Sequence, residues 1–459
     1  MKLSNLFYGF ATTTLFFVSC SKDEVYETVD SESIDLVEEV SSKALKPIGS
    51  GVMMQAFYWD VPAGGTWWNV VKSKVGEWSN AGVDAIWLPP VSKAQNGPFS
   101  MGYDPFDYYD FGEFNQMGST ETRFGSRSEL TSLITAAHNN SLSVIADIVI
   151  NHNSGGDLES NEFAGKDTYT KFEPMSGKFF RTKYDFHPNE AYSSDSGIFG
   201  GFPDLSHSKV YVQDWLWGRS NSVAKYYKNT MGFDGWRFDY VKGFEPWVVR
   251  EWKNNVGGFS VGEYWDGNVN TLDWWTNEAQ MSAFDFACYY KMRDAFVGNN
   301  LNALSGDMLW KRNASRAVTF VANHDTDEIY NNKILAYAYI LTHEGYPALF
   351  YRDYEDWLDK NKLNNLIWIH NNLAGGSTSN LWTDNDEYIA RRNGGGGKNG
   401  LVVYINNSNS WKERWVQTNW SNRQIKDYTG ASGWQPTTQG GRWVKIQAPP
   451  KGYSVWSLK

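Results

Sequence analysis

The sequence predicts an α/β protein built on a closed (β/α)8 barrel, with a subdomain inserted after the third barrel strand and a C-terminal antiparallel β-sandwich. Three observations predict it. Strands and helices alternate from Gly51 onward, eight apolar stretches spread over about 320 residues end in polar or charged side chains, and the pattern changes after about residue 371. A doubly wound open sheet is the alternative, but no glycine-rich dinucleotide fingerprint follows the first predicted strand.

Eight stretches are predicted as barrel strands because they are short, apolar and followed by polar residues. In chain order they are residues 51–59, 83–90, 142–150, 233–243, 259–265, 283–286, 317–325 and 348–351. Between the second and third of them, Ser126 and Glu129 form a capping box ahead of apolar residues at helical spacing, which marks the start of a helix. The barrel as a whole is predicted to span residues 49–370.

The region after the third predicted strand is too long for one crossover helix. About eighty residues separate that strand from the fourth, and they are rich in Gly, Ser, Asp and aromatic residues. We therefore expect an inserted subdomain over residues 152–207, followed by crossover helices over residues 208–231 that end at Gly232. Beyond the barrel, residues 371–459 show short alternating stretches separated by Gly and Asn clusters, which predict the antiparallel C-terminal domain.

The first residues carry a predicted export signal over residues 1–19. Lys2 precedes the apolar run 6–18, which has about the length of a signal-peptide core and is too short to span a bilayer. The run leads into Cys20 in a stretch that resembles a bacterial lipobox, in which the cysteine carries the lipid. Residues 20–48 then read as the anchor and a disordered, acidic tether. We expect an outer-membrane or cell-surface lipoprotein, with a periplasmic or secreted protein as the alternative.

Composition excludes some partners. The net charge of −10 argues against binding to nucleic acid or to an anionic membrane surface. The chain has 23 Trp, 26 Tyr and 26 Phe, whose flat rings suit the apolar faces of sugars, although a Trp-rich core would give the same counts. With only two cysteines no disulfide framework is predicted, and Cys288 reads as a small buried residue.

One stretch, FDGWRFDYVKG at 233–243, combines a cation and an acid on one strand face. Side chains alternate along a strand, so Arg237 and Asp239 share a face and Trp236 and Phe238 share the other. A guanidinium group beside a buried carboxylate keeps that carboxylate ionised, and a clamped, dehydrated carboxylate is a ready nucleophile. The alternative for an isolated Arg-x-Asp is a structural ion pair.

Four carboxylates follow predicted strands and would converge at one end of the barrel: Asp147, Asp239, Glu263 and Asp325. Like charges at such distances cannot all ionise, so one must hold a proton at neutral pH. A retaining glycosidase needs this combination of a nucleophilic carboxylate and a protonated acid. His152 and His324 could donate hydrogen bonds to sugar hydroxyls as neutral imidazoles, although each alone could be a satisfied loop histidine.

Four motifs give these residues a family context. They are DIVINH (147–152), GWRFDYVKG (235–243), GEYW (262–265) and FVANHD (320–325). In order, they resemble the four conserved regions of glycoside hydrolase family 13, the alpha-amylase family. The segments MGYDP, DYVKG and VGEYWD are similar to alpha-amylases of the archaeal and plant-like type.

The resemblance implies roles for the acids. Asp239 would be the nucleophile, Glu263 the general acid/base and Asp325 the third acid, which binds sugar hydroxyls and stabilises the transition state, whereas Asp147 is read as a structural acid at a strand end. A further set would bind substrate: Tyr103, His152, Arg237, Lys242 and His324.

The resemblance also implies a structural calcium ion that joins the insert to the barrel. Its oxygen ligands would come from Asn151, Asp195, Gly197, Asp204 and Gly243. Zinc, which some archaeal relatives bind beside calcium, is not supported, because only His187 matches their ligands and Tyr192 and Ser206 occupy the other two positions.

The function expected from the sequence is that of an endo-acting alpha-amylase, which cleaves internal α-1,4 bonds of starch or glycogen with retention through a covalent glycosyl-enzyme. A family transglycosylase or maltogenic amylase is one alternative. A surface lipoprotein that binds starch without cutting it is another. The expected partner is an α-glucan, with no nucleic acid, membrane contact only through the lipid anchor, and a monomeric state.

Overall fold

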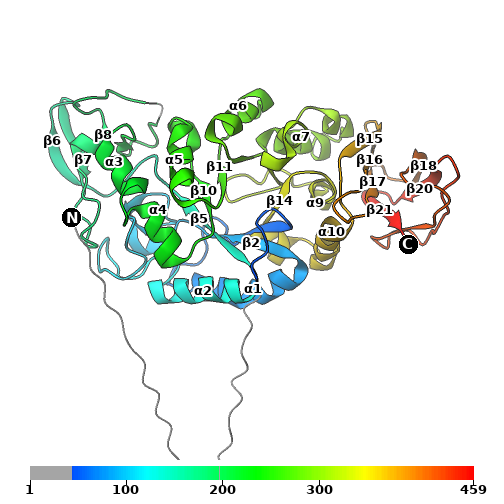
Figure 1. Ribbon diagram of the computed structural model, residues 1–459, viewed down its shortest axis with the longest axis horizontal. Coiled ribbons are helices and arrows are strands. Elements are labelled where there is room, and N and C mark those ends of the chain that lie inside the picture. Colours follow the sequence, from blue (N-terminus) through cyan, green and yellow to red (C-terminus); the bar gives the residue numbers. More distant parts are fainter. Residues whose placement is uncertain (1–43, 196) are drawn as a thin grey trace, which may run out of the picture. The chain divides into compact units, whose positions relative to one another are not determined.

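The computed structural model describes residues 44–195 and 197–459 (Figure 1). The predicted signal segment, Cys20 and most of the predicted tether lie outside the described residues, so these expectations stay predictions. Among the described residues, none of the helices combines the length and the apolar character needed to cross a bilayer.

Eight parallel strands close into a barrel, as predicted. Their order around the barrel is β1-β14-β13-β12-β11-β10-β5-β2. Their bounds are β1 Val52–Gln55, β2 Val83–Trp87, β5 Ser143–Ile148, β10 Gly235–Phe238, β11 Phe259–Gly262, β12 Ser282–Phe284, β13 Ala317–Phe320 and β14 Tyr346–Phe350. The short pair β3 (Lys93–Ala94) and β4 (Pro105–Asp107) lies in the long connection after β2. The predicted strands coincide with these eight, although most are shorter because their last residues turn into the loops.

Helices connect the strands. Their bounds are α1 Trp67–Ala81, α2 Arg127–Asn139, α3 Val210–Gln213, α4 Val223–Tyr226, α5 Trp247–Val256, α6 Val269–Ala279, α7 Phe286–Phe296, α8 Leu309–Arg312, α9 Lys333–Thr342 and α10 Lys360–Asn372. The capping box at the start of α2 is confirmed: the Ser126 N–H donates to Glu129 Oε2 at 2.8 Å, and the Glu129 N–H donates to Ser126 Oγ at 3.4 Å. As predicted, the crossover from α3 through α4 ends at Gly232, which adopts a left-handed conformation that glycine takes without strain.

The insert between β5 and β10 contains two antiparallel strand pairs. β6 (Asp157–Asn161) pairs with β7 (Lys166–Lys171), and β8 (Phe186–His187) pairs with β9 (Asp204–Leu205). The Leu205 N–H donates to the Asn151 carbonyl at 2.9 Å, which ties β9 to the segment that leaves barrel strand β5. The insert is thereby attached to the end of the barrel where the strands terminate.

The C-terminal domain is a sandwich of two antiparallel sheets. The larger sheet has the order β15-β16-β17-β21-β19, and β18 pairs with β20. The bounds are β15 Thr378–Thr383, β16 Glu387–Arg392, β17 Leu401–Asn406, β18 Lys412–Gln417, β19 Ile425–Asp427, β20 Trp443–Ala448 and β21 Gly452–Leu458. One buried cluster joins the sheets, with Tyr404 and Trp456 from the larger and Val416 and Ile446 from the smaller. The predicted β-sandwich is confirmed.

Gly262 ends β11 and directly precedes Glu263, and we predict that it cannot be replaced by alanine without loss of stability. A Cβ at this position would overlap the ring of Trp275, which is buried on α6. Gly262→Ala should therefore lower the free energy of unfolding by about 1–3 kcal/mol. Chemical denaturation measures this. Gly433→Ala is the matched control because a Cβ there has open space, so equal stability of the two variants would contradict the prediction.

Candidate active site

Neighbouring barrel strands bring the predicted acids to one rim. The Asp239 N–H donates to the Ile148 carbonyl at 3.0 Å, and the Glu263 N–H donates to the Phe238 carbonyl at 2.9 Å. These bonds continue the sheet pattern one residue beyond β10 and β11. Both carboxylates therefore follow directly from regular, buried strands, which fixes the backbone that carries them.

Arg237 contacts three carboxylates. Its Nη1 donates to Asp147 Oδ1 at 2.9 Å and to Asp239 Oδ1 at 2.8 Å, and its Nη2 lies 2.7 Å from Glu263 Oε1. The last contact is close but lacks hydrogen-bond alignment, since neither atom has a hydrogen-bond partner among the described residues. Arg237 is only 1% exposed, so these contacts act with little screening by solvent.

The surroundings of Arg237 shift several pKa values. Burial alone would lower the pKa of Arg237, but the charges of Asp147 and Glu263 outweigh it and raise that pKa well above its ordinary value. Burial raises the pKa of Glu263 to about 8, helped by the charges of Asp239 and Asp325 and opposed by Arg237. Burial also raises the pKa of Asp325 to about 6, and the charge of Arg237 again opposes the shift. At neutral pH Glu263 therefore holds a proton and can act as an acid.

His324 is held in one tautomer. Gln55 Nε2 donates to His324 Nδ1 at 3.0 Å, which leaves the proton on Nε2, 3.0 Å from Asp325 Oδ2. Burial and the charge of Arg237 lower the pKa of His324 well below its ordinary value, so the ring is neutral. Sequence reasoning missed Gln55. The signal was available, because Gln55 is the one polar residue in the apolar run Val52–Phe57.

Asp147 lies behind the other two acids and accepts three hydrogen bonds. Besides Arg237, it receives one from Tyr103 Oη at 2.9 Å and one from Trp87 Nε1 at 3.0 Å, both on Oδ2. It is 3% exposed and does not line the cavity described below. This placement agrees with its interpretation as a structural acid. The Tyr103 ring in turn lies nearly parallel to His324, with centroids 5.2 Å apart.

Asp239, Glu263 and Asp325 line a cavity of about 720 Å³. Tyr103, His324 and Lys242 line it as well, together with aromatic residues that sequence reasoning did not assign: Trp59, Phe99, Phe199, Phe202, Tyr240 and Trp265. A second hollow of about 280 Å³ shares Trp59, His324 and Asp325 with the first. Binding space thus continues beyond the three acids, with Asp325 on the boundary.

Tyr240 makes the turn that follows Asp239. Its backbone is left-handed, with φ at 43°, and its N–H donates to Glu263 Oε2 at 3.2 Å. The Tyr240 ring lies beside that of Phe199, with centroids 4.8 Å apart. The turn therefore places the Tyr240 N–H against the Glu263 carboxyl group and the Tyr240 ring in the cavity wall.

Of the predicted substrate-binding residues, Tyr103, Lys242 and His324 line the cavity, whereas His152 and Arg237 are buried outside its lining. His152 is fully buried, outside the cavity lining; its Nε2 donates to the Tyr103 carbonyl at 2.9 Å, and its ring lies nearly parallel to that of Phe199. Lys242 lies at the rim, where its Nζ donates to the Trp265 carbonyl at 2.9 Å. Direct contact of either residue with substrate stays a prediction.

The five predicted calcium ligands meet beside the cavity. A Cβ on Gly197 would lie 2.8 Å from both Asp195 Oδ1 and the Gly243 carbonyl, and would overlap the Asp204 carboxylate. A Cβ on Gly243 would in turn overlap Asn151 Oδ1. The Asn151 side chain is anchored through its Nδ2, which donates to the Gly197 carbonyl at 2.7 Å.

This group has buried oxygens without partners. Within residues 44–195 and 197–459, both carboxylate oxygens of Asp204 and the Oδ1 of Asn151 are buried and accept no hydrogen bond. Burial and the nearby Asp195 raise the pKa of Asp204 to about 8. A divalent cation would bind such closely spaced oxygens and supply the partner that they lack. The residues present therefore fit calcium.

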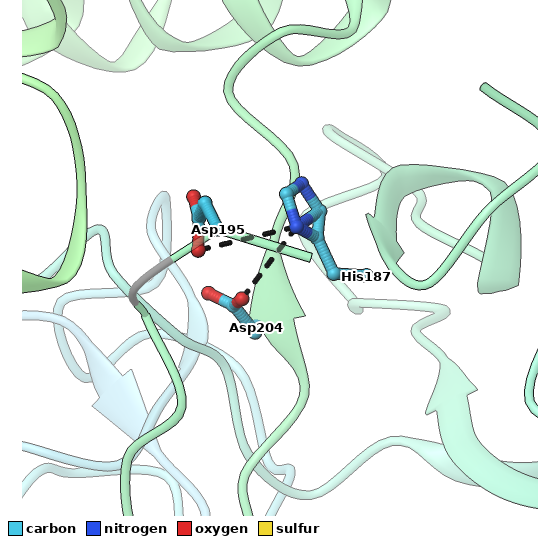
Figure 2. Close-up of side chains that lie close together, drawn as sticks. All are labelled: His187, Asp195 and Asp204. Atoms are coloured by element: carbon cyan, nitrogen blue, oxygen red, sulfur yellow. Dashed lines mark ion pairs between the residues drawn. The ribbon is translucent and has the colours of Figure 1, made fainter. Parts of the chain in front are cut away.

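His187 joins this group, which the calcium prediction did not foresee. Figure 2 shows its ring facing Asp195 and Asp204, with Nδ1 3.9 Å from Asp195 Oδ1 and 3.7 Å from Asp204 Oδ2. Its Nε2 lies 2.7 Å from Ser206 Oγ, and its ring is nearly parallel to that of Tyr192. His187, Tyr192 and Ser206, the three positions compared with a zinc site, therefore do lie together. The phenol of Tyr192 and the hydroxyl of Ser206 replace the stronger zinc donors.

A set of acids at the C-terminal rim of such a barrel is the arrangement that a glycoside hydrolase needs. The chain belongs to the alpha-amylase family. The family's catalytic-domain pattern, "Alpha amylase, catalytic domain", matches residues 63–335, which is more than half of the chain. A second pattern, "Alpha-amylase C-terminal", matches residues 401–457.

Individual relatives agree with this assignment. The alpha-amylase of Geobacillus stearothermophilus is 28% identical over 494 residues, which covers 90% of this chain and 88% of that protein. The glucan 1,4-alpha-maltohexaosidase of Bacillus sp. (strain 707) is 29% identical over 376 residues, or 66% of this chain and 71% of that protein. The crystal structure of the Geobacillus thermoleovorans alpha-amylase complexed with acarbose matches with a TM-score of 0.71 at 19% identity. The match covers 90% of this chain and 99% of the crystallised chain, and it supports the fold. The archaeal and plant-like subtype stays a prediction.

Proposed function

We propose that the protein is an endo-acting alpha-amylase that hydrolyses internal α-1,4 bonds of starch or glycogen with retention of configuration. The contact of Asp239 and Glu263 with one guanidinium group carries the proposal. Retaining glycosidases need their two carboxyl groups about 5–5.5 Å apart, whereas inverting enzymes separate them by about 6.5–9.5 Å to admit a water molecule. Binding to adjacent nitrogens of Arg237 favours the shorter separation.

The two acids would work in sequence. In the first step a carboxylate oxygen of Asp239 forms a bond to the anomeric carbon while the glycosidic C–O bond breaks and Glu263 gives its proton to the departing oxygen. In the second step Glu263, now ionised, takes a proton from water, whose oxygen attacks the same carbon and releases Asp239. Arg237 remains bound to both acids throughout and stabilises whichever is ionised.

Asp325 and the neutral His324 would bind hydroxyl groups of the sugar at the cleavage point. The Nε2–H of His324 points toward Asp325, so the pair offers both a donor and an acceptor without adding net positive charge. The Tyr103 ring, parallel to His324, would cover an apolar face of the same sugar.

Internal cleavage is favoured by the two connected hollows. The main cavity and the second hollow meet at Trp59, His324 and Asp325, so a glucan chain could occupy space on both sides of the acids. The names of the relatives, alpha-amylase and glucan 1,4-alpha-maltohexaosidase, support an α-1,4-linked glucan as substrate.

We also propose a structural calcium ion held by Asn151, Asp195, Gly197, Asp204 and Gly243. Calcium, when bound, would neutralise the two aspartates and hold the insert against the barrel, because Asn151 and Gly243 follow barrel strands while the other three belong to the insert. The five residues would bind through oxygen atoms, and His187 would face the site from the insert.

Asp239→Asn tests the nucleophile. Because an amide does not attack the anomeric carbon, hydrolysis of soluble starch should fall by more than about 10⁴-fold. The variant should keep the circular-dichroism spectrum of the wild type. In the wild type, proton NMR should detect the α-anomer as the first product. Near-wild-type activity of the variant, or a β-anomeric first product, would contradict the mechanism.

The pH dependence should follow the proton on Glu263. The first step needs this proton, so kcat/KM should decline as the pH rises through about 8. An unperturbed glutamic acid, with a pKa near 4.3, would give the decline in the acid range instead. Glu263→Gln should lose the alkaline decline when assayed with α-glucosyl fluoride, whose leaving group needs no proton. Persistence of that decline in the variant would assign it to another group.

Calcium removal should destabilise the fold. Incubation with EDTA should lower Tm, because an ion present at about 100 times its Kd contributes about 2.7 kcal/mol to stability. Asp204→Asn should have a lower Tm before chelation and respond little to it. Asp157→Asn, at an exposed acid of the same insert, should respond as the wild type does. A Tm that EDTA leaves unchanged in the wild type would rule out a structural ion.

A further inference from the structure

Two exposed tryptophans share one face of the small sheet in the C-terminal domain. In the antiparallel pair β18 and β20, Trp415 lies opposite Lys445 and Gln417 lies opposite Trp443. Because side chains alternate along a strand, Trp415 and Trp443 point to the same side, as diagonal neighbours. They are 55% and 45% exposed, which is unusual for residues of this size.

The opposite face of the same sheet is anchored in the domain core. Val416, Val444 and Ile446 are buried and belong to the cluster that also contains Trp456 of β21. The core therefore fixes the position and register of β18 and β20. Trp415 and Trp443 thus project from a rigid element, which keeps the arrangement of their rings ready for a ligand.

Trp415 and Trp443 enclose a hollow of about 300 Å³ together with Gln439. Gln439 belongs to the tight turn before β20, where its N–H donates to the Trp443 carbonyl at 2.8 Å and its carbonyl accepts from the Arg442 N–H at 2.8 Å. The exposed Gln439 side chain brings an amide, which can both donate and accept hydrogen bonds, to the edge of the two rings.

The two charged side chains that β18 and β20 place on this face cancel. Glu413 and Lys445, which point to the same side as the tryptophans, form an ion pair with each other. What remains is two indole rings and side-chain amides, which suit a neutral ligand with apolar faces and many hydroxyl groups. The ion pair of Glu413 and Lys445 offers a polyanion no uncompensated positive charge.

We propose that Trp415, Trp443 and Gln439 form an auxiliary site that binds α-glucan chains by stacking sugar rings on the two indoles. The choice of an α-glucan rests on the proposed function. None of these three residues lines the active-site cavity, so the site would bind a different part of the same polymer. Binding there raises the effective concentration of a long or insoluble glucan at the enzyme, whereas a short oligosaccharide gains nothing from it.

The test uses the full chain carrying Trp415→Ala and Trp443→Ala together. The apparent Kd for granular starch, from depletion of protein from solution, should increase about tenfold. The kcat/KM for a short soluble maltooligosaccharide should remain at the wild-type value. Trp415→Phe with Trp443→Phe, which keeps an aromatic face at both positions, should recover part of the adsorption and so separates stacking from damage to the fold.

Trp382→Ala is the matched control. Trp382 belongs to the same domain and is 43% exposed, but the Arg414 guanidinium covers its ring at 4.1 Å from the centroid, and its Nε1 donates to Asp384 at 2.9 Å. This variant should adsorb to starch as the wild type does. Cellulose, a neutral glucan with β linkages, should bind the wild type more weakly than starch.

Three results would overturn the proposal. The first is unchanged starch adsorption by the double alanine variant, and the second is equal adsorption of the wild type to starch and to cellulose. The third is a wild-type dimer in sedimentation that the double variant dissociates, because this face would then be a contact between copies of the chain. Adsorption that depends on Trp415 and Trp443 in a chain that hydrolyses no α-glucan would uphold this site and overturn the proposed function. Hydrolysis of α-glucan by a chain whose adsorption does not depend on Trp415 or Trp443 would uphold the proposed function and overturn this site.

Discussion

The contact between Arg237 and three carboxylates is the constraint on which the active-site end of the barrel depends. A guanidinium group that is 1% exposed cannot be buried without partners, and three adjacent strands supply them: Asp147 and Asp239 accept hydrogen bonds from it, and Glu263 lies against it. The register of β5, β10 and β11 must therefore be right for the charge to be tolerated at all. The strand register that closes this part of the barrel is therefore also the register that brings the acids together.

The same contact explains how similar side chains acquire different chemistry. Asp239 meets Arg237 through an aligned hydrogen bond, whereas Glu263 lies close to Arg237 without that alignment and takes a hydrogen bond from a backbone N–H. Burial then raises the pKa of Glu263 to about 8. Two acids on one cation therefore differ in their readiness to hold a proton, which is the asymmetry that the proposed double displacement would use.

The sequence could predict what local periodicity determines. The eight strands, the Ser126 capping box and the shared face of Arg237 and Asp239 all follow from patterns a few residues long, and the positions of the acids follow from strand ends. Phe199 and the approach of His187 to the calcium ligands were not predicted, because their positions depend on the folding of a loop-rich insert; Gln55 stood out as a polar residue in an apolar strand, but its partner His324 is distant in the sequence. Likewise, no pattern indicated that His152 would lie behind the cavity wall.

The left-handed turn at Tyr240 ties the two halves of the reaction to one short piece of backbone. The N–H of Tyr240, the residue after Asp239, donates to Glu263, so a displacement of the end of β10 would move Asp239 and this donor together. A substitution that shifted the backbone at Tyr240 would therefore disturb both acids at once, even though it altered neither of them.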